Sequence, residues 1–280
     1  MTHHSDSPDR QPINPRPRKA TFFVTCLVDQ FRPQVGDAVV DVMEALGVGL
    51  DVPQEQTCCG QPAFNSGYRS EAREVASRFL DIFDDTSDNP APIVAPSGSC
   101  AAMVRNYYPI LFRDEPAQLE RVERVADRLW EFSEFIVDGL GETSIGPSSQ
   151  NTSSTATYHR CCHALRELGV DSQPTTLLDS VAGLEVTPME RSEVCCGFGG
   201  AFSVKMPDIS TAMLNEKLDN VQKTGASRLV AGDTGCIMHM EGGLRRRGSS
   251  VQVLHIAELL AESVRRRNGS SSPAAGGVAE

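Results

Sequence analysis

Short apolar runs alternate with amphipathic segments along this chain of 280 residues, and the same order of segments occurs twice. In each half a β-type run is followed by a helix-type segment, a second short run, a longer helix-type segment, a further strand-type run and a closing amphipathic segment. Strands that alternate with helices are typical of parallel α/β layers. The pattern predicts strands at residues 21–25, 92–95, 155–158 and 228–231. It predicts helices at residues 35–46, 70–83, 129–137, 164–168, 175–181, 208–223 and 254–262.

The first helical region of each half is followed by a glycine, Gly47 or Gly183, and the two lie 136 residues apart. Glycine at this place is typical of a helix C-terminus. We therefore predict an α/β fold of two tandem duplicated Rossmann-like halves, each with a parallel sheet, related by a pseudo-two-fold axis. The expected divisions are a disordered arm (1–18), a first half (19–140), a low-complexity linker (141–156), a second half (157–266) and a disordered tail (267–280).

Composition and charge exclude several classes of protein. The formal net charge is −11, which argues against a nucleic-acid binder, because such proteins neutralise phosphates. No apolar stretch approaches the roughly 18–20 residues of a membrane span, and the polar N-terminus lacks the apolar core of a signal peptide. We expect a cytoplasmic protein. In that reducing compartment, nine cysteines indicate metal or redox chemistry rather than disulfides.

The cysteines repeat in register. Eight of the nine form two copies of one pattern, in which a lone cysteine precedes a Cys-Cys-Gly and another lone cysteine follows it. Each copy supplies four thiols, the number that one metal or iron–sulfur centre needs, so the repeat predicts two such centres that arose by duplication. The two expected sets are Cys26, Cys58, Cys59 and Cys100, and Cys162, Cys195, Cys196 and Cys236.

The position of these cysteines favours cluster chemistry. Cys100 and Cys236 each follow a strand and a glycine-containing turn, where helix N-terminal N–H groups favour thiolate. Adjacent cysteines do not suit one tetrahedral zinc, whose cysteine pairs are usually separated by two to four residues. They suit a multi-iron centre. A Gly-x-Gly-x-x-Gly after a strand is absent, so no nucleotide-binding fingerprint is present.

The remaining candidate residues are less determined. Cys161 stands next to Cys162, but the equivalent position in the first half is Thr25, which argues against a ligand role and leaves it open. His163 and His239 stand close to predicted ligands, and we expect them near the sites, as hydrogen-bonding neighbours or, for His163, a proton relay. His159 and His255 are expected to pack or to cap elements.

Four segments carry a resemblance to a known family. They are QTCCGQPAFNSG (56–67), YHRCCHALRELG (158–169), CCGFGG (195–200) and LHIAE (254–258). On these segments the chain resembles the cysteine-rich (CCG) domain family of iron–sulfur oxidoreductases, and within it the branch that acts in lactate utilization. The resemblance covers residues of about 21–263, nearly the whole ordered chain.

The resemblance implies an iron–sulfur protein of L-lactate oxidation to pyruvate, an oxidoreductase subunit that transfers electrons. It also implies two clusters, [4Fe-4S] or non-cubane, held by the eight cysteines, and two partner proteins of lactate utilization. Because the Cys-x₂-Cys-x₂-Cys-x₃-Cys signature is absent here, a partner would carry ferredoxin-type clusters. The 2-hydroxy acid could bind on that partner. Related domains occur in heterodisulfide reductase and glycolate oxidase.

One departure from the family bears on the cluster. The heterodisulfide reductase motif ends in Cys-x-x-Cys, whereas this chain has Ser97 and Asp233 three residues before its last cysteines. Four thiols per site fit an ordinary four-iron cluster better than a non-cubane one. A different class of function, a zinc-binding or thiol-based structural subunit, remains the alternative.

Overall fold

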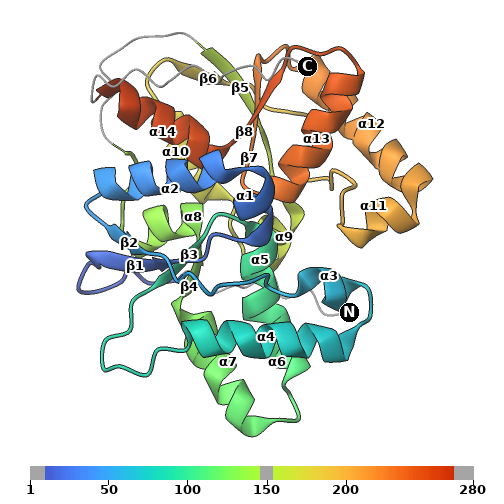
Figure 1. Ribbon diagram of the computed structural model, residues 1–280. Helices are drawn as coiled ribbons and strands as arrows, with labels where there is room; N and C mark the ends of the chain where they lie inside the picture. Colours follow the sequence, from blue (N-terminus) through green and yellow to red (C-terminus); the bar gives the residue numbers. More distant parts are fainter. Residues whose placement is uncertain (1–9, 146–153, 268–280) are drawn as a thin grey trace.

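The computed structural model describes residues 10–145 and 154–267, which form two four-stranded sheets (Figure 1). The strand order is β2-β1-β3-β4 in the first sheet and β6-β5-β7-β8 in the second, and these pairings are parallel. The prediction of two duplicated parallel-sheet halves is confirmed. The strands are β1 Lys19–Phe22, β2 Gly49–Asp51, β3 Ile93–Ala95, β4 Leu129–Glu131, β5 Ser154–His159, β6 Leu184–Val186, β7 Arg228–Ala231 and β8 Gln252–His255.

Helices connect successive strands in both halves, and two π-helical turns, η1 and η2, interrupt the first half. The first half has α1 Cys26–Phe31, α2 Pro33–Ala45, α3 Gln61–Asn65, α4 Arg69–Phe83, α5 Gly98–Ala102, η1 Met103–Tyr107, α6 Tyr108–Leu111, α7 Pro116–Arg128, α8 Phe132–Glu134 and η2 Phe135–Gly139. The second half has α9 Cys162–Glu167, α10 Ser172–Asp179, α11 Ala201–Lys205, α12 Pro207–Lys223, α13 Thr234–Arg246 and α14 Ile256–Arg267. Gly47 follows the C-cap residue of α2 with a φ angle of 76°, so this predicted helix end is confirmed. Helix α10 already ends at Asp179, and Gly183 (φ 75°) instead lies in the turn directly before β6.

The closing segment of each half differs from the prediction. The segment 129–137, expected as one helix, starts with β4, and the segment 254–262 contains the end of β8 before α14. These strands pair with β3 and β7 and complete their sheets. All three residues of β4 are buried, so the strand shows no alternation of apolar and polar positions. A short buried strand of this kind cannot be told from a buried helix by periodicity.

Two hydrophobic cores hold the molecule together, and each contains residues of both halves. Along β3, Ile93 and Ala95 face one core and Val94 faces the other, as the two faces of a pleated strand require. The second core lies between the sheets and includes α2 of the first half packed on α14 of the second, drawn in blue and red in Figure 1. The halves therefore share their cores instead of forming separate ones.

The described part of the N-terminal arm is packed. The guanidinium carbon of Arg10 lies 3.6 Å from the centroid of the Trp130 ring. The N–H of Ile13 donates to the carbonyl oxygen of Gly139 at 3.0 Å. From Arg10 onward, in a segment where the sequence predicted disorder, these contacts cover an aromatic ring and satisfy the end of η2.

The expected linker and tail lie partly outside the described residues. Strand β5 begins at Ser154, so the last three residues of the expected linker 141–156 belong to the second sheet. Helix α14 continues to Arg267, and residues 1–9, 146–153 and 268–280 are outside the described part of the chain. None of the helices in the described ranges combines the length and apolarity that a membrane span needs.

Candidate metal centre

Each predicted cysteine lies just beyond the carboxyl end of a strand. Cys26 and Cys162 begin α1 and α9, which follow β1 and β5. Cys100 and Cys236 lie in the first turns of α5 and α13, which follow β3 and β7. The Cys-Cys-Gly segments follow β2 and β6. Neighbouring parallel strands end at the same edge of a sheet, so this topology gathers four thiols in each half.

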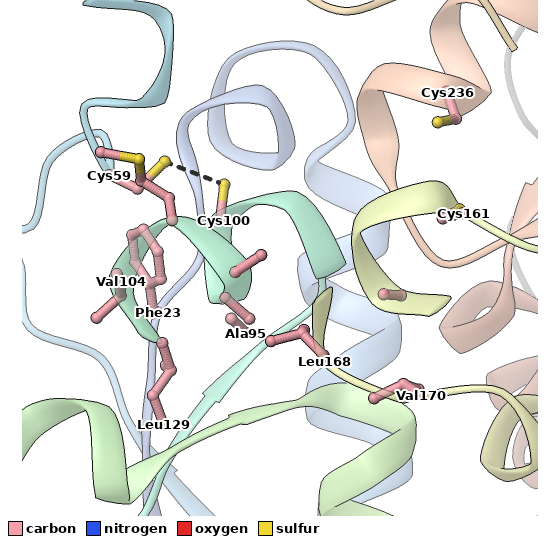
Figure 2. Close-up of a cluster of buried hydrophobic side chains, with 14 of the residues drawn as sticks. Phe23, Cys59, Ala95, Cys100, Val104, Leu129, Cys161, Leu168, Val170 and Cys236 are labelled. Carbon is pink, nitrogen blue, oxygen red and sulfur yellow. Dashed lines mark hydrogen bonds between the residues drawn. The ribbon is translucent and has the colours of Figure 1, made fainter. Parts of the chain in front are cut away.

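The first site contains two thiol pairs. Cys26 Sγ lies 3.6 Å from Cys58 Sγ, and both side chains are half-buried. Cys59 Sγ lies 3.5 Å from Cys100 Sγ, and both are buried (Figure 2). The four thiols that the sequence placed in one site are therefore brought together, as an outer and an inner pair.

The second site repeats this arrangement and adds a fifth thiol. The thiols of Cys162 and Cys195 interact, as do those of Cys196 and Cys236. Cys161 is buried and lines the same cavity; its S–H donates to the carbonyl oxygen of His159 at 3.7 Å, and the Cys161 thiol raises the pKa of Cys236. Both cysteines are labelled in Figure 2. The repeat pattern did not predict a place for Cys161 at the second site, because the first half has Thr25 at the equivalent position.

A single cavity of about 210 Å³ joins the two sites. Its walls include Cys161 and His163 and the paired polar residues Ser97 and Asp233. The predicted thiols that line it are Cys26, Cys58, Cys59, Cys100, Cys162, Cys195, Cys196 and Cys236. The two sites therefore face each other across one cavity between the halves.

One thiol in each site is stabilised as a thiolate. The S–H of Cys26 hydrogen-bonds to the sulfur of Cys58 and, together with the Gly60 N–H, lowers the pKa of Cys58 to about 3. The equivalent bond from Cys162 lowers the pKa of Cys195 to about 2. Thiolate is the form of cysteine that binds metals, so each site contains a thiol prepared for binding.

The predicted neighbouring histidines lie in different environments. His163 Nδ1 is 3.7 Å from Cys162 Sγ, and the ring lines the cavity. His239 Nε2 instead lies 3.4 Å from Ser210 Oγ, behind the Cys-Cys-Gly turn that Ser210 Oγ also contacts. The structure brings His163 to the site; His239 contacts a residue that supports it.

His159 and His255 are both fully buried, so both pack in the interior as expected. His255 Nδ1 accepts from the Ala257 N–H at the start of α14, which is a cap. The ring of His159 has an Nε2 atom within 4.8 Å of the sulfurs of Cys196 and Cys236. Sequence reasoning missed this neighbour, since its equivalent in the first half is Phe23.

The donors suit a sulfur-ligated metal centre. Soft thiolates select zinc, copper(I) or iron–sulfur clusters, whereas carboxylates and carbonyls select magnesium or calcium. Glycines with positive φ, Gly60 (80°) and Gly197 (91°), follow the cysteine pairs. A Cβ on Gly197 would lie 2.6 Å from the Ser210 carbonyl oxygen, so only glycine fits this turn. Cysteine clusters of this kind are suited to binding a metal or a cluster.

Comparisons with known proteins agree with this geometry. Lactate utilization protein A from Bacillus cereus is 47% identical over 242 residues, which cover 86% of this chain and 98% of the relative. Lactate utilization protein A from Bacillus cytotoxicus is 46% identical, and lactate utilization protein A 2 from Bacillus mycoides is 47% identical, with the same coverage.

A similar fold occurs in the crystal structure of a hypothetical protein from Helicobacter pylori, with a TM-score of 0.55 and 11% identity. That match covers 96% of this chain, which spans only 53% of the other. The cysteine-rich domain itself matches residues 20–105 and 156–241, one copy in each half. The chain therefore belongs to the cysteine-rich (CCG) domain family.

Proposed function

We propose that the chain is an iron–sulfur protein that transfers electrons in the oxidation of L-lactate to pyruvate. One observation carries this proposal: two registered sets of thiols, one from each half, line a single cavity. Iron–sulfur clusters supply one-electron transfer when bound by such thiolates. Lactate oxidation releases two electrons, which matches two one-electron sites placed close together.

The residues themselves support clusters over isolated ions. Each site has at least four cysteines, and neighbours such as Cys58 and Cys59 direct their sulfurs to different partners, Cys26 and Cys100. One small ion would not need sulfurs spread in this way, whereas a multi-iron centre uses them. We therefore assign Cys26, Cys58, Cys59 and Cys100 as ligands of one [4Fe-4S] cluster and Cys162, Cys195, Cys196 and Cys236 as ligands of the other.

The assignment to lactate follows from relatives that are named lactate utilization proteins. Within the described residues no arginine lines the cavity, so a carboxylate lacks its usual partner there. We place the 2-hydroxy acid on a partner subunit, which also carries ferredoxin-type clusters for onward electron transfer. A reducing cytoplasm would keep these free thiols available.

Anaerobic purification followed by iron and acid-labile sulfide assays tests the proposal. Two four-iron clusters require about eight irons and eight sulfides per chain. One or two zinc ions without sulfide would instead establish the structural alternative.

Single substitutions test whether the two sites are separate. Cys59→Ser and Cys196→Ser are expected each to remove about half of the iron, because each changes a buried thiol of one site only. Loss of all iron from either variant would contradict two independent ligand sets.

A further inference from the structure

The second site has a nitrogen donor that the first site does not have. His159 ends β5, directly before the loop that carries Cys161 and Cys162. It is fully buried, and its Nε2 has no hydrogen-bond partner among the described residues. A buried polar atom without a partner is uncommon and requires an explanation.

The tautomer of His159 is fixed by its other nitrogen. Nδ1 lies 3.2 Å from the carbonyl oxygen of Ser192, which can only accept, so Nδ1 must carry the proton. Nε2 has no acceptor within hydrogen-bond reach among the described residues, so a proton there would be buried without a partner. Nε2 consequently presents an unprotonated lone pair. Metal-binding histidines have this same arrangement, with the second nitrogen donating to a carbonyl or carboxylate.

The lone pair is placed among thiols. His159 Nε2 and the sulfurs of Cys196 and Cys236 all lie within 4.8 Å of one another. Bonds from a metal are about 2.3 Å to sulfur and about 2.1 Å to nitrogen. Donors within 4.8 Å of one another can therefore reach the same metal centre after small movements of the side chains.

The first site is built differently at the same place. The equivalent residue, Phe23, packs edge-to-face on Phe79 with ring centroids 4.8 Å apart. In the second half the space is polar, since Lys217 of α12 donates to the carbonyl oxygens of Arg191 and Ser192 at 2.7 and 3.1 Å. The Ser192 carbonyl oxygen thus accepts hydrogen bonds from both Lys217 and His159. The histidine belongs to a network of buried polar groups, whereas the first site has an aromatic pair at the equivalent place.

We propose that His159 binds the metal centre of the second site through Nε2, which makes the two sites chemically different. The inference rests on the proposed function, because it requires a cluster between the second set of thiols. A four-iron cluster has one protein ligand for each iron, so His159 takes the place of Cys196 or Cys236, the two thiols beside it. A neutral imidazole in place of a thiolate removes one negative charge, and histidine ligation raises the reduction potential in Rieske centres. The second site therefore accepts electrons more readily than the first.

Pulsed electron paramagnetic resonance tests this ligand directly. The full chain, purified anaerobically and reduced with dithionite, is compared with the same protein labelled with ¹⁵N-histidine. A nitrogen with strong hyperfine coupling, whose pattern changes with the isotope, is expected. His159→Phe, which introduces the residue of the first half, should abolish this coupling. His163→Phe, which removes the other histidine beside the second site, should retain it.

A second variant keeps the experiment decisive if His159→Phe loses its second cluster. His159→Cys retains a donor, so the cluster is expected to remain while its reduction potential falls. Wild-type protein that contains iron and sulfide but shows only weakly coupled nitrogen would overturn the histidine ligand and leave the proposed function standing. Protein without iron or sulfide would overturn both.

Discussion

Ser97 Oγ donates a hydrogen bond of 2.9 Å to Oδ2 of Asp233, and this bond joins equivalent positions of the two halves. Asp233 also accepts from the N–H groups of Ser99 and Gly235, both at 3.1 Å. Both positions precede the last cysteine of a site by three residues. The two side chains bind each other and thereby connect the two sites.

Replacing Ser97 by alanine should destabilise the protein by about 2 kcal/mol, because a buried bond to a carboxylate and a helix N-cap are lost together. Ser97 Oγ caps α5 by accepting from the Cys100 N–H. Urea unfolding of the metal-free protein measures the effect. Ser99→Ala is the comparison variant. It keeps the backbone bond from Ser99 to Asp233 and loses only the contact of the Ser99 hydroxyl with Ser97 Oγ at 3.1 Å, so it should lower the free energy of unfolding less than Ser97→Ala. Equal losses in the two variants would contradict a special role for the Ser97 side chain.

The two halves approach each other closely at Gly98, which begins α5. A Cβ at this position would lie 2.7 Å from the Cβ of Ala164 on α9 and 3.0 Å from its backbone nitrogen. Gly98→Ala should therefore push the helices apart and lower the free energy of unfolding by about 2 kcal/mol or more, the usual cost of overpacking.

Gly36 provides the control for that substitution. A Cβ at Gly36 would meet its nearest neighbour, a methyl of Val28, at 3.7 Å, an ordinary contact. Gly36→Ala in α2 should be neutral or stabilising by up to about 1 kcal/mol, since alanine favours helix. A stable Gly98→Ala protein with unchanged cavity and iron content would show that the halves do not need this contact.

The repeat in the sequence was sufficient to predict the duplicated parallel sheets and the grouping of eight thiols, because strand order determines which carboxyl ends meet. It did not predict β4 and β8, whose short buried runs have no strand periodicity. The repeat also did not single out Cys161 and His159, because the equivalent residues of the first half are Thr25 and Phe23. Features that differ between the halves become visible only when the side chains are placed in space.

His255 makes the stability of the metal-free protein depend on pH. Burial lowers its pKa in the folded protein to about 4, whereas the unfolded chain has the ordinary value of 6.5. The folded state binds fewer protons between these values, so stability falls as the pH falls from 6.5 towards 4. At pH 5, protonation of this one group should lower the free energy of unfolding by about 2 kcal/mol relative to neutral pH.

The variant His255→Gln tests this dependence, because glutamine can still donate to the Pro96 carbonyl oxygen, which His255 Nε2 contacts at 3.0 Å. Wild type should be the more stable protein at pH 7, and the difference in unfolding free energy between the two should narrow as the pH is lowered to 5. A difference that stays constant over this range would show that His255 does not titrate in this way.

Lys217 is expected to support the second site alone. Its amine is buried and bonds to the carbonyl oxygens of Arg191 and Ser192, in the loop that leads to Cys195. Lys217→Met keeps the apolar stem but removes two hydrogen bonds from a charged donor, each worth about 1.5–3 kcal/mol. The Arg191 and Ser192 carbonyl oxygens still accept from the backbone N–H groups of Val194 and Arg160. The loop should loosen, and iron per chain should fall by about half.

Lys223 on the same helix is the matched control. Its side chain is 65% exposed and pairs with Glu190 at 3.5 Å, an interaction worth less than about 1 kcal/mol at a surface. Lys223→Met should therefore retain full iron and nearly full stability. In the described residues of the first half, the Phe23–Phe79 pair takes the place behind the thiols and no lysine is buried there. The Lys217 variant should therefore keep its first site intact. Loss of iron from both sites would mean that the loop supports the shared cavity as a whole.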